Sequence, residues 1–146
     1  MVIITPIDKD PSTEVFHELM VNPKFTPQII FQQALDELDG NDLDQVQACE
    51  KAYLASLKAI DKYILEQDGT KIRAGEPDAH SQRKDTLEAM ALKGVKHAGD
   101  LFRLLGEITD VLHGGCYYRC KVPTQYIKDV YFKQLVPEIL EKAGCY

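Results

Sequence analysis

Apolar side chains recur at steps of three and four residues along most of the chain, the spacing of α-helices with one buried face. The pattern is clearest from about Asp42 to Gln67, where a neighbouring face of alanines predicts close contact with a second helix. Asp68-Gly69 is a typical helix end. The apolar face comprises Val46, Cys49, Tyr53, Leu57, Ile60 and Ile64, and the alanine face comprises Ala48, Ala52, Ala55 and Ala59.

The same spacing predicts three further main helices. Thr26-Pro27 predicts a cap and a first helical position for a helix that ends near Leu38. A long third helix is expected from Asp85 or Thr86 to Leu112, and Gly114-Gly115 should end or bend it, because glycine disfavours helix. The fourth should begin at Val122-Pro123-Thr124, with a kink or a split at Pro137.

Two segments fall outside this pattern. Residues 1–25 predict an N-terminal arm with a short helix inside Ser12–Met20, and residues 68–85 predict a long polar loop. Residues 26–146 would then form one helical bundle domain. Short connections between long helices favour antiparallel neighbours, so the predicted fold is all-α, an up-and-down antiparallel four-helix bundle with an N-terminal arm or short extra helix. The one stretch with strand character is Val2-Ile3-Ile4.

Size and charge narrow the classes of function. A chain of 146 residues is enough for one domain with its own core. The net charge of −6 opposes binding to a nucleic-acid backbone and argues against a DNA-binding domain, although a local basic pocket stays compatible with it.

No apolar run approaches the roughly 20 residues of a membrane span, and the N-terminus lacks the features of a secretory signal. We therefore expect a cytoplasmic protein with no membrane partner, and free thiols at its four cysteines, Cys49, Cys116, Cys120 and Cys145.

The segment from Leu112 to Cys120 concentrates candidate chemistry. His113 could act as an acid or base near neutral pH, with Asp110 one turn earlier to orient it. Tyr117, Tyr118 and Arg119 could stack on or hydrogen-bond a base or a phosphate. A polar line leads to this end of the predicted third helix: Arg103, Glu107, Asp110 and His113.

A structural interpretation competes with that functional one. His113 can be a residue at the border of the core, Gly114-Gly115 a turn, and the two tyrosines amphipathic packing. A zinc site is the third alternative, since His113, Cys116 and Cys120 would align in a continuous helix. Structural zinc sites usually pair two short Cys motifs, whereas this chain has one C-x3-C and no second pair. We therefore expect no metal and no cofactor.

The order of the elements and two sequence stretches resemble the HEPN superfamily of small helical bundles. The stretches are "ACEKAYLASLKAIDKYILEQDG" in the predicted second helix and "ITDVLHGGCYYR" at the end of the third, and the resemblance covers roughly Thr26 to Ala143. It is closest to short bacterial and archaeal members of that superfamily. The resemblance implies a four-helix up-and-down bundle, often a homodimer.

The resemblance also implies two classes of function. Many HEPN proteins are toxins that cut RNA with an arginine followed about four to six residues later by a histidine, near one face of a helix. Others lack that motif and bind a nucleotide, RNA or a partner nucleotidyltransferase. Here Arg103 precedes His113 by ten positions and does not share its face, so the arginine role is vacant or is filled by a residue such as Arg119.

The expected function is therefore a non-catalytic HEPN-like bundle that binds a nucleotide, RNA or a protein partner through His113, Tyr117, Tyr118, Arg119, Asp110 and Arg103. The alternatives are a metal-independent ribonuclease with His113 as its catalytic acid or base, and a structural dimerisation module that uses the apolar helix faces.

Overall fold

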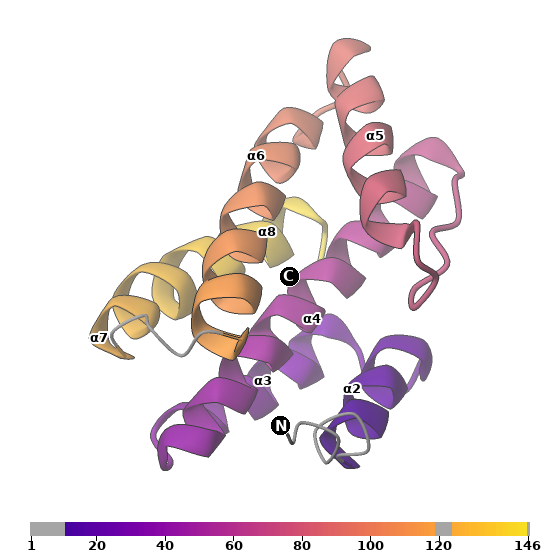
Figure 1. Ribbon diagram of the computed structural model, residues 1–146. Helices are drawn as coiled ribbons and strands as arrows, with labels where there is room; N and C mark the ends of the chain where they lie inside the picture. Colours follow the sequence, from indigo (N-terminus) through magenta and orange to yellow (C-terminus); the bar gives the residue numbers. More distant parts are fainter. Residues whose placement is uncertain (1–10, 119–123, 146) are drawn as a thin grey trace.

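The computed structural model describes residues 11–118 and 124–145, and every regular element in these ranges is helical (Figure 1). The predicted strand at Val2-Ile3-Ile4 lies outside them. The elements are α2 (Pro11–Val21), α3 (Pro27–Leu38), α4 (Asp42–Asp68), α5 (Ala79–Leu92), α6 (Ala98–Ile108), the π-helix η1 (Thr109–Tyr118), α7 (Thr124–Tyr126), the π-helix η2 (Ile127–Leu135) and α8 (Val136–Lys142).

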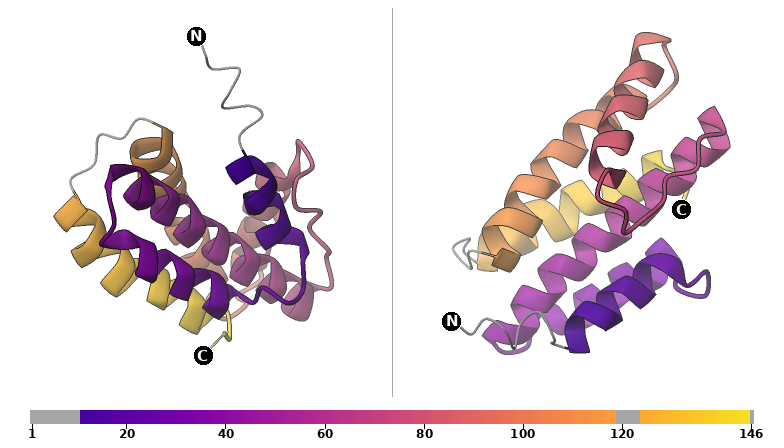
Figure 2. Two further views of the ribbon diagram at one scale, coloured as in Figure 1. Left: turned by 90° about the horizontal axis from the view of Figure 1, so that it is seen from below. Right: turned by 45° about the vertical axis from the view of Figure 1, so that its right-hand side comes forward.

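Helix α4 is the centre of the molecule. It contacts α2, α3, α5, α6, η1 and α8, and it crosses the whole structure in each view (Figure 2). Its four alanines, Ala48, Ala52, Ala55 and Ala59, are completely buried, which confirms the predicted alanine face. Because these side chains are small, the neighbouring helices can approach α4 closely. The largest buried side chains of the shared core are Ile30, Ile60, Ile64, Leu87, Met90, Leu101, Leu104, Leu105, Ile108, Leu112, Ile127 and Ile139.

Local signals define the ends of α3 and α4, and both helices were predicted. The Thr26 side chain accepts a hydrogen bond from the Ile29 amide, and Pro27 opens α3. At the start of α4, Asn41 and Asp44 form a reciprocal capping box. Gly69 ends α4 with φ +79°, a left-handed conformation that suits glycine.

The prediction of one long third helix was wrong. Residues 79–118 form a hairpin, with α5 as one arm and the continuous helix of α6 and η1 as the other (Figure 1). Gly94 adopts φ +78° after α5, and the Val95 amide donates to the Met90 carbonyl at 3.0 Å. This is the hydrogen-bond pattern of a Schellman helix end. Since α5 begins at Ala79, the loop after α4 is also shorter than predicted.

The expectation that Gly114-Gly115 ends or bends the helix was also wrong. After Ile108 the backbone changes to the wider π register and continues through both glycines to Tyr118. The last predicted helix is likewise mixed, with π-helical residues 127–135 before α8, and Pro137 lies in the first turn of α8. Pro137 thus lies just after the junction of the π-helical and α-helical segments.

The N-terminal arm contains the predicted short helix. Phe16 and Leu19 of α2 are buried in the common core, and α2 packs on α4. Lys58 of α4 secures the end of α2, because its Nζ donates to the carbonyl oxygens of Leu19, Asn22 and Phe25 at 2.8, 2.7 and 2.6 Å. These bonds satisfy carbonyl groups at and beyond a helix end.

Candidate functional site

One face of α4 brings three chemically distinct side chains against η1. Cys49, Glu50 and Tyr53 occupy a single turn of α4, and each of them contacts a residue of η1. Glu50 is 7% exposed, which is unusual for a carboxylate because its charge must then be paired within the protein. Its partner is His113.

The imidazole of His113 is held from two sides. Its Nδ1 lies 2.8 Å from Glu50 Oε1, and its ring stacks on the ring of Tyr53 with centroids 4.6 Å apart and planes 21° apart. An ionised carboxylate only accepts hydrogen bonds, so Nδ1 carries a hydrogen and the ring orientation is defined. The His113 side chain is 31% exposed, and it therefore presents part of an oriented imidazole at the surface.

Tyr53 extends the contact along η1. Its hydroxyl oxygen lies 3.5 Å from Thr109 Oγ1, and the Thr109 hydroxyl also donates to the Leu105 carbonyl at 2.7 Å. Thr109 is the residue at which α6 becomes π-helical. π-Helical segments inside α-helices occur frequently at functional sites, and here the segment carries His113.

A disulfide joins the same two elements. Cys49 of α4 and Cys116 of η1 are bonded, with their Cα atoms 6.2 Å apart. The expectation of free thiols was therefore wrong for this pair, because the fold places two cysteines that are 67 positions apart within bonding distance. Cys145 is a free, buried thiol, and Cys120 lies outside the described residues.

A second histidine lies near the first. Burial lowers the pKa of His80, at the start of α5, and the positive charges of Lys84, Arg83 and His113 lower it further. Of these three groups, Arg83 is paired with Asp61 and His113 contacts Glu50, whereas Lys84 lies exposed on α5. His80 is only partly exposed.

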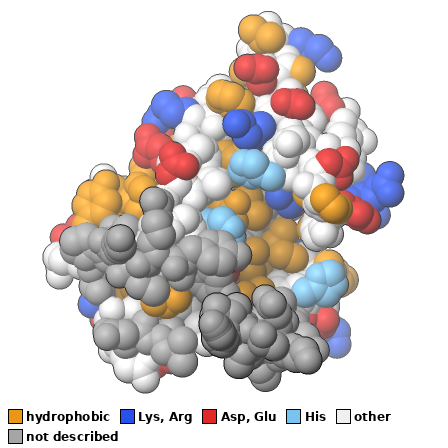
Figure 3. Space-filling model, viewed as in Figure 1, with side chains coloured by type: hydrophobic (Ala, Val, Ile, Leu, Met, Phe, Trp, Pro, Cys, Tyr) orange, Lys and Arg blue, Asp and Glu red, His pale blue; other side chains and the backbone are white. Residues whose placement is uncertain are grey.

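Figure 3 shows histidine side chains around a hydrophobic stretch of surface, on the face that α2, α5 and α6 border. On the α2 side, a Cβ built at Gly75 would lie 3.7 Å from the His17 ring, so this ring packs against the loop before α5. The oriented ring of His113, further imidazole rings and apolar surface thus occur together on this face.

The predicted site residues are only partly brought together. Arg103 is exposed on α6 and lies within ion-pair distance of Asp100 and Glu107, at 3.7 and 3.9 Å. Asp110 is exposed as well, and Glu50 fills the orienting role that the sequence assigned to Asp110. Tyr117 and Tyr118 end η1, but their side chains lie outside the described part of the chain, as does the whole of Arg119.

Sequence reasoning missed Glu50, Tyr53 and His80. One signal for Glu50 was present, since it is four residues after Val46 and four before Leu54, inside a stripe that otherwise consists of apolar side chains. A charge in such a stripe indicates either a buried partner or a functional role. No local signal could have paired it with His113, 63 residues later.

In the described ranges, no group of three or more His, Cys, Asp or Glu residues could hold a metal ion. Cys116 is also bonded to Cys49 and thus offers no thiolate, while the third member of the hypothetical zinc set, Cys120, lies outside those ranges.

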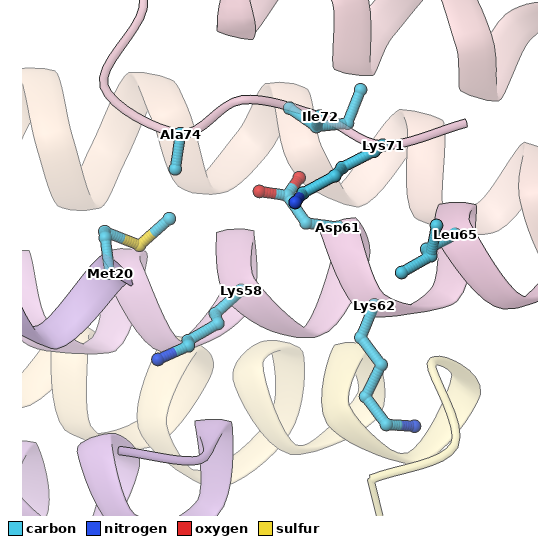
Figure 4. A pocket seen from close by; sticks show the side chains of 8 residues that line it. All are labelled: Met20, Lys58, Asp61, Lys62, Leu65, Lys71, Ile72 and Ala74. Atoms are coloured by element: carbon cyan, nitrogen blue, oxygen red, sulfur yellow. The ribbon is translucent and has the colours of Figure 1, made fainter. Parts of the chain in front are cut away.

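A pocket of about 230 Å³ lies between the end of α2, helix α4 and the loop before α5 (Figure 4). Burial lowers the pKa of Lys58, which closes the end of α2. Asp61 accepts two hydrogen bonds from the buried Arg83, at 2.5 and 2.8 Å, and burial raises its pKa in spite of that pairing. These charges hold α2 and α5 on α4. The lining residues are Met20, Lys58, Asp61, Lys62, Leu65, Lys71, Ile72 and Ala74.

Comparison of the chain with protein-family models, with curated proteins and with solved structures finds no match in any of the three. Within the described residues, no helix combines the length and the apolar character that crossing a membrane requires.

Proposed function

We propose that the chain is a HEPN-like helical bundle that binds a phosphate-bearing ligand, a nucleotide or RNA, on the face formed by α4, η1 and the start of α5. The observation that carries the proposal is the contact of His113 with the buried Glu50 and with the ring of Tyr53. The Glu50 carboxylate and the Tyr53 ring orient the imidazole of His113, and an oriented imidazole is a group that hydrogen-bonds phosphate and base ligands.

The charges around this face support an anionic ligand. Lys84, Arg83 and His113 lie near His80, and the exposed ammonium group of Lys84 can pair with an incoming phosphate. Glu50 contacts His113 and Asp61 contacts Arg83, so these two carboxylates are engaged within the protein. The hydrophobic surface between the histidines would accommodate a base by stacking or apolar contact.

The direct test is the affinity for a fluorescently labelled single-stranded oligoribonucleotide and for a nucleoside monophosphate, measured at low salt. We expect His113→Ala and Glu50→Gln to weaken binding about tenfold or more, which corresponds to about 1.4 kcal/mol. His97→Asn is a matched control, since His97 begins α6 at φ +73° and asparagine tolerates that conformation. Equal affinities for all four proteins would refute the site.

A second candidate function is metal-independent RNA cleavage, and the nearness of His80 to His113 favours it. The ribose 2′-oxygen would attack phosphorus and the bond from phosphorus to the 5′-oxygen would break. One imidazole accepts the proton of the 2′-hydroxyl, and the other donates a proton to the leaving oxygen. His80 suits the first role, because a lowered pKa keeps it neutral at pH 7.

Incubation with RNA in the presence of a chelator separates this activity from binding. Cleavage that requires both His80 and His113, tested as alanine variants, would establish the enzyme. Equal residual cleavage by the wild type and by both variants would identify a contaminant and leave the binding function alone.

The arrangement proposed for the bundle follows the resemblance. The four up-and-down members would be α3, α4, the continuous helix α6–η1 and the segment α7–η2–α8. Helices α2 and α5 would be additions to this bundle. A homodimer in the cytoplasm and a nucleotidyltransferase partner are proposals on the same basis. Light scattering at high protein concentration tests the dimer, and a monomer there would exclude it along with the dimerisation module.

A further inference from the structure

The disulfide lies at the site, at the point where η1 meets α4. Cys49 directly precedes Glu50, and Cys116 follows His113 by one helical turn. The bond and the contact between Glu50 and His113 therefore cross from α4 to η1 within one turn of each helix. Any movement of η1 away from α4 that breaks one of these contacts would strain the other.

The segment that carries His113 has little local reason to be helical. Gly114 and Gly115 occupy two consecutive positions of η1, and glycine is among the poorest helix formers. The π register has poor intrinsic stability as well, and it persists in proteins where tertiary contacts impose it. For the end of η1, the disulfide is the strongest such contact among the described residues.

We propose that the thiol–disulfide state of Cys49 and Cys116 controls the His113 site, which is formed with the disulfide and lost in the dithiol form. The control of ligand binding rests on the proposed function, whereas the control of the contact between Glu50 and His113 does not. In the dithiol form η1 is tied to α4 by non-covalent contacts alone. The glycine pair can then leave the helical register and carry His113 away from Glu50.

The chemical step is ordinary thiol–disulfide exchange with a dithiol reductant. Its thiolate attacks the sulfur of Cys116, the more exposed of the two residues at 7% against 1%, and Cys49 leaves as a thiolate that takes up a proton. The second thiol of the reductant attacks the mixed disulfide and releases Cys116, which is protonated in turn. The protein gains two electrons and two protons, and the reductant becomes a cyclic disulfide.

Burial of both sulfurs makes this a slow control. A reductant reaches Cys116 only when the end of η1 opens, so the exchange rate follows local opening of that segment. The site would therefore respond to a sustained change in the thiol balance of its surroundings.

The first measurement needs no ligand. Imidazole carbon–proton NMR signals of the four histidines are recorded before and after treatment with dithiothreitol. We expect the His113 signal to shift on reduction, with a smaller change at His97, which begins α6 at the far end of the hairpin. Cys116→Ala should reproduce the reduced spectrum without reductant, and Cys145→Ala should behave as the wild type, because Cys145 is a free thiol.

The second measurement is the affinity for the labelled oligoribonucleotide in both states, which we expect to fall about tenfold or more on reduction. If the oxidised protein binds no RNA but the His113 signal still moves, the proposed function fails and the redox control of the histidine stands. If RNA binds and neither the signal nor the affinity changes on reduction, the control is wrong and the binding function stands.

Two further results would overturn the proposal. One is alkylation of Cys49 and Cys116 in the untreated protein, detected by mass spectrometry, which would show that the bond is absent. The other is complete loss of helical circular dichroism on reduction at 25 °C, since the bond would then serve folding as a whole and not the site.

Discussion

The hairpin of α3 and α4 and the continuous helix α6–η1 contribute to one core, but they are specified in different ways. Helix α4 has a capping box at Asn41 and a left-handed glycine at Gly69, so its ends are encoded by residues beside them in the sequence. Helix α6 starts at Ala98 without a side-chain cap from His97 before it, and it passes at Thr109 into a π-helix. Long-range contacts to α4 hold this second segment, and it is the one that carries the candidate site.

Removal of the disulfide should have the largest effect, both on the stability of the protein and on the contrast between α4 and η1. A cross-link between residues 67 positions apart restricts the unfolded chain, and the loop-entropy model assigns it about 4 kcal/mol. The double variant Cys49→Ala/Cys116→Ala should therefore lower Tm on the order of 10 °C. Hydrogen exchange should show that amides of η1 lose more protection than those of α4.

The control for this variant is Cys145→Ala, which removes a buried cysteine that forms no cross-link. It should lower Tm much less than the double variant does. If η1 and α4 lost protection equally in the double variant, the local dependence of η1 on the bond would be refuted, although the stabilisation itself would remain.

Overpacking of the alanine face of α4 should have the next largest effect. Ala52 is completely buried beneath neighbouring helices, so Ala52→Leu has no space for its three additional carbons. We expect a loss of about 1–3 kcal/mol in the free energy of unfolding, measured with urea. Ala89→Leu on the exposed side of α5 is the matched control and should be nearly neutral. A neutral Ala52→Leu would mean that the helices are not closely packed there.

The helix caps permit the most direct comparison. Asn41 accepts a hydrogen bond from the Asp44 amide at 2.9 Å, whereas Asp78 at the start of α5 makes no side-chain capping bond. Asn41→Ala should therefore cost about 1 kcal/mol of stability. Asp78→Ala should cost clearly less, in the same urea titration. Equal costs would show that the capping geometry does not decide how these helices begin.

A glycine in α6 offers a gain in stability. Gly106 is exposed inside the helix, and a Cβ there would meet no other atom within 4 Å. Gly106→Ala should raise the free energy of unfolding by about 0.4–1 kcal/mol, because alanine restricts the unfolded chain. Gly94→Ala should do the opposite, since Gly94 has φ +78°. A destabilising Gly106→Ala would indicate that α6 needs this glycine for a reason outside its own packing.

These contrasts explain which parts of the fold the sequence could predict. The boundaries of α3 and α4 were predicted because Thr26, Pro27 and Gly69 act on adjacent backbone. The third helix was misjudged because Ala91, Gly94 and Ala98 fit helical spacing, although Gly94 begins a Schellman turn. Spacing alone does not separate a small residue on a helix face from one that ends the helix.

The candidate site was harder to predict, for a physical reason. His113 could be identified from its unusual neighbours, but its partners Glu50, Tyr53 and Cys49 belong to a distant helix. Contacts between residues more than 60 positions apart depend on how the helices pack. The sequence analysis therefore assigned the orientation of His113 to Asp110, in the adjacent turn. In the structure the buried Glu50 of α4 has this role.

The smallest expected effect is the pH dependence of stability due to His80, and it tests the burial of this ring and the influence of the cations beside it. Burial, followed by Lys84, Arg83 and His113, lowers the pKa of His80 below its ordinary value of 6.5, so the folded protein binds fewer protons there than the unfolded chain. The free energy of unfolding should then rise with pH from the lowered pKa up to about 6.5.

His80→Asn should flatten this part of the curve in urea titrations at stepped pH. Lys84→Gln should flatten it in part, because removal of that charge lets the pKa of His80 rise. If His80→Asn left the slope unchanged, the pKa of His80 would not be lowered in the folded protein. If Lys84→Gln alone left it unchanged, burial would account for the lowered pKa, and the support of the Lys84 charge for an anionic ligand would be lost.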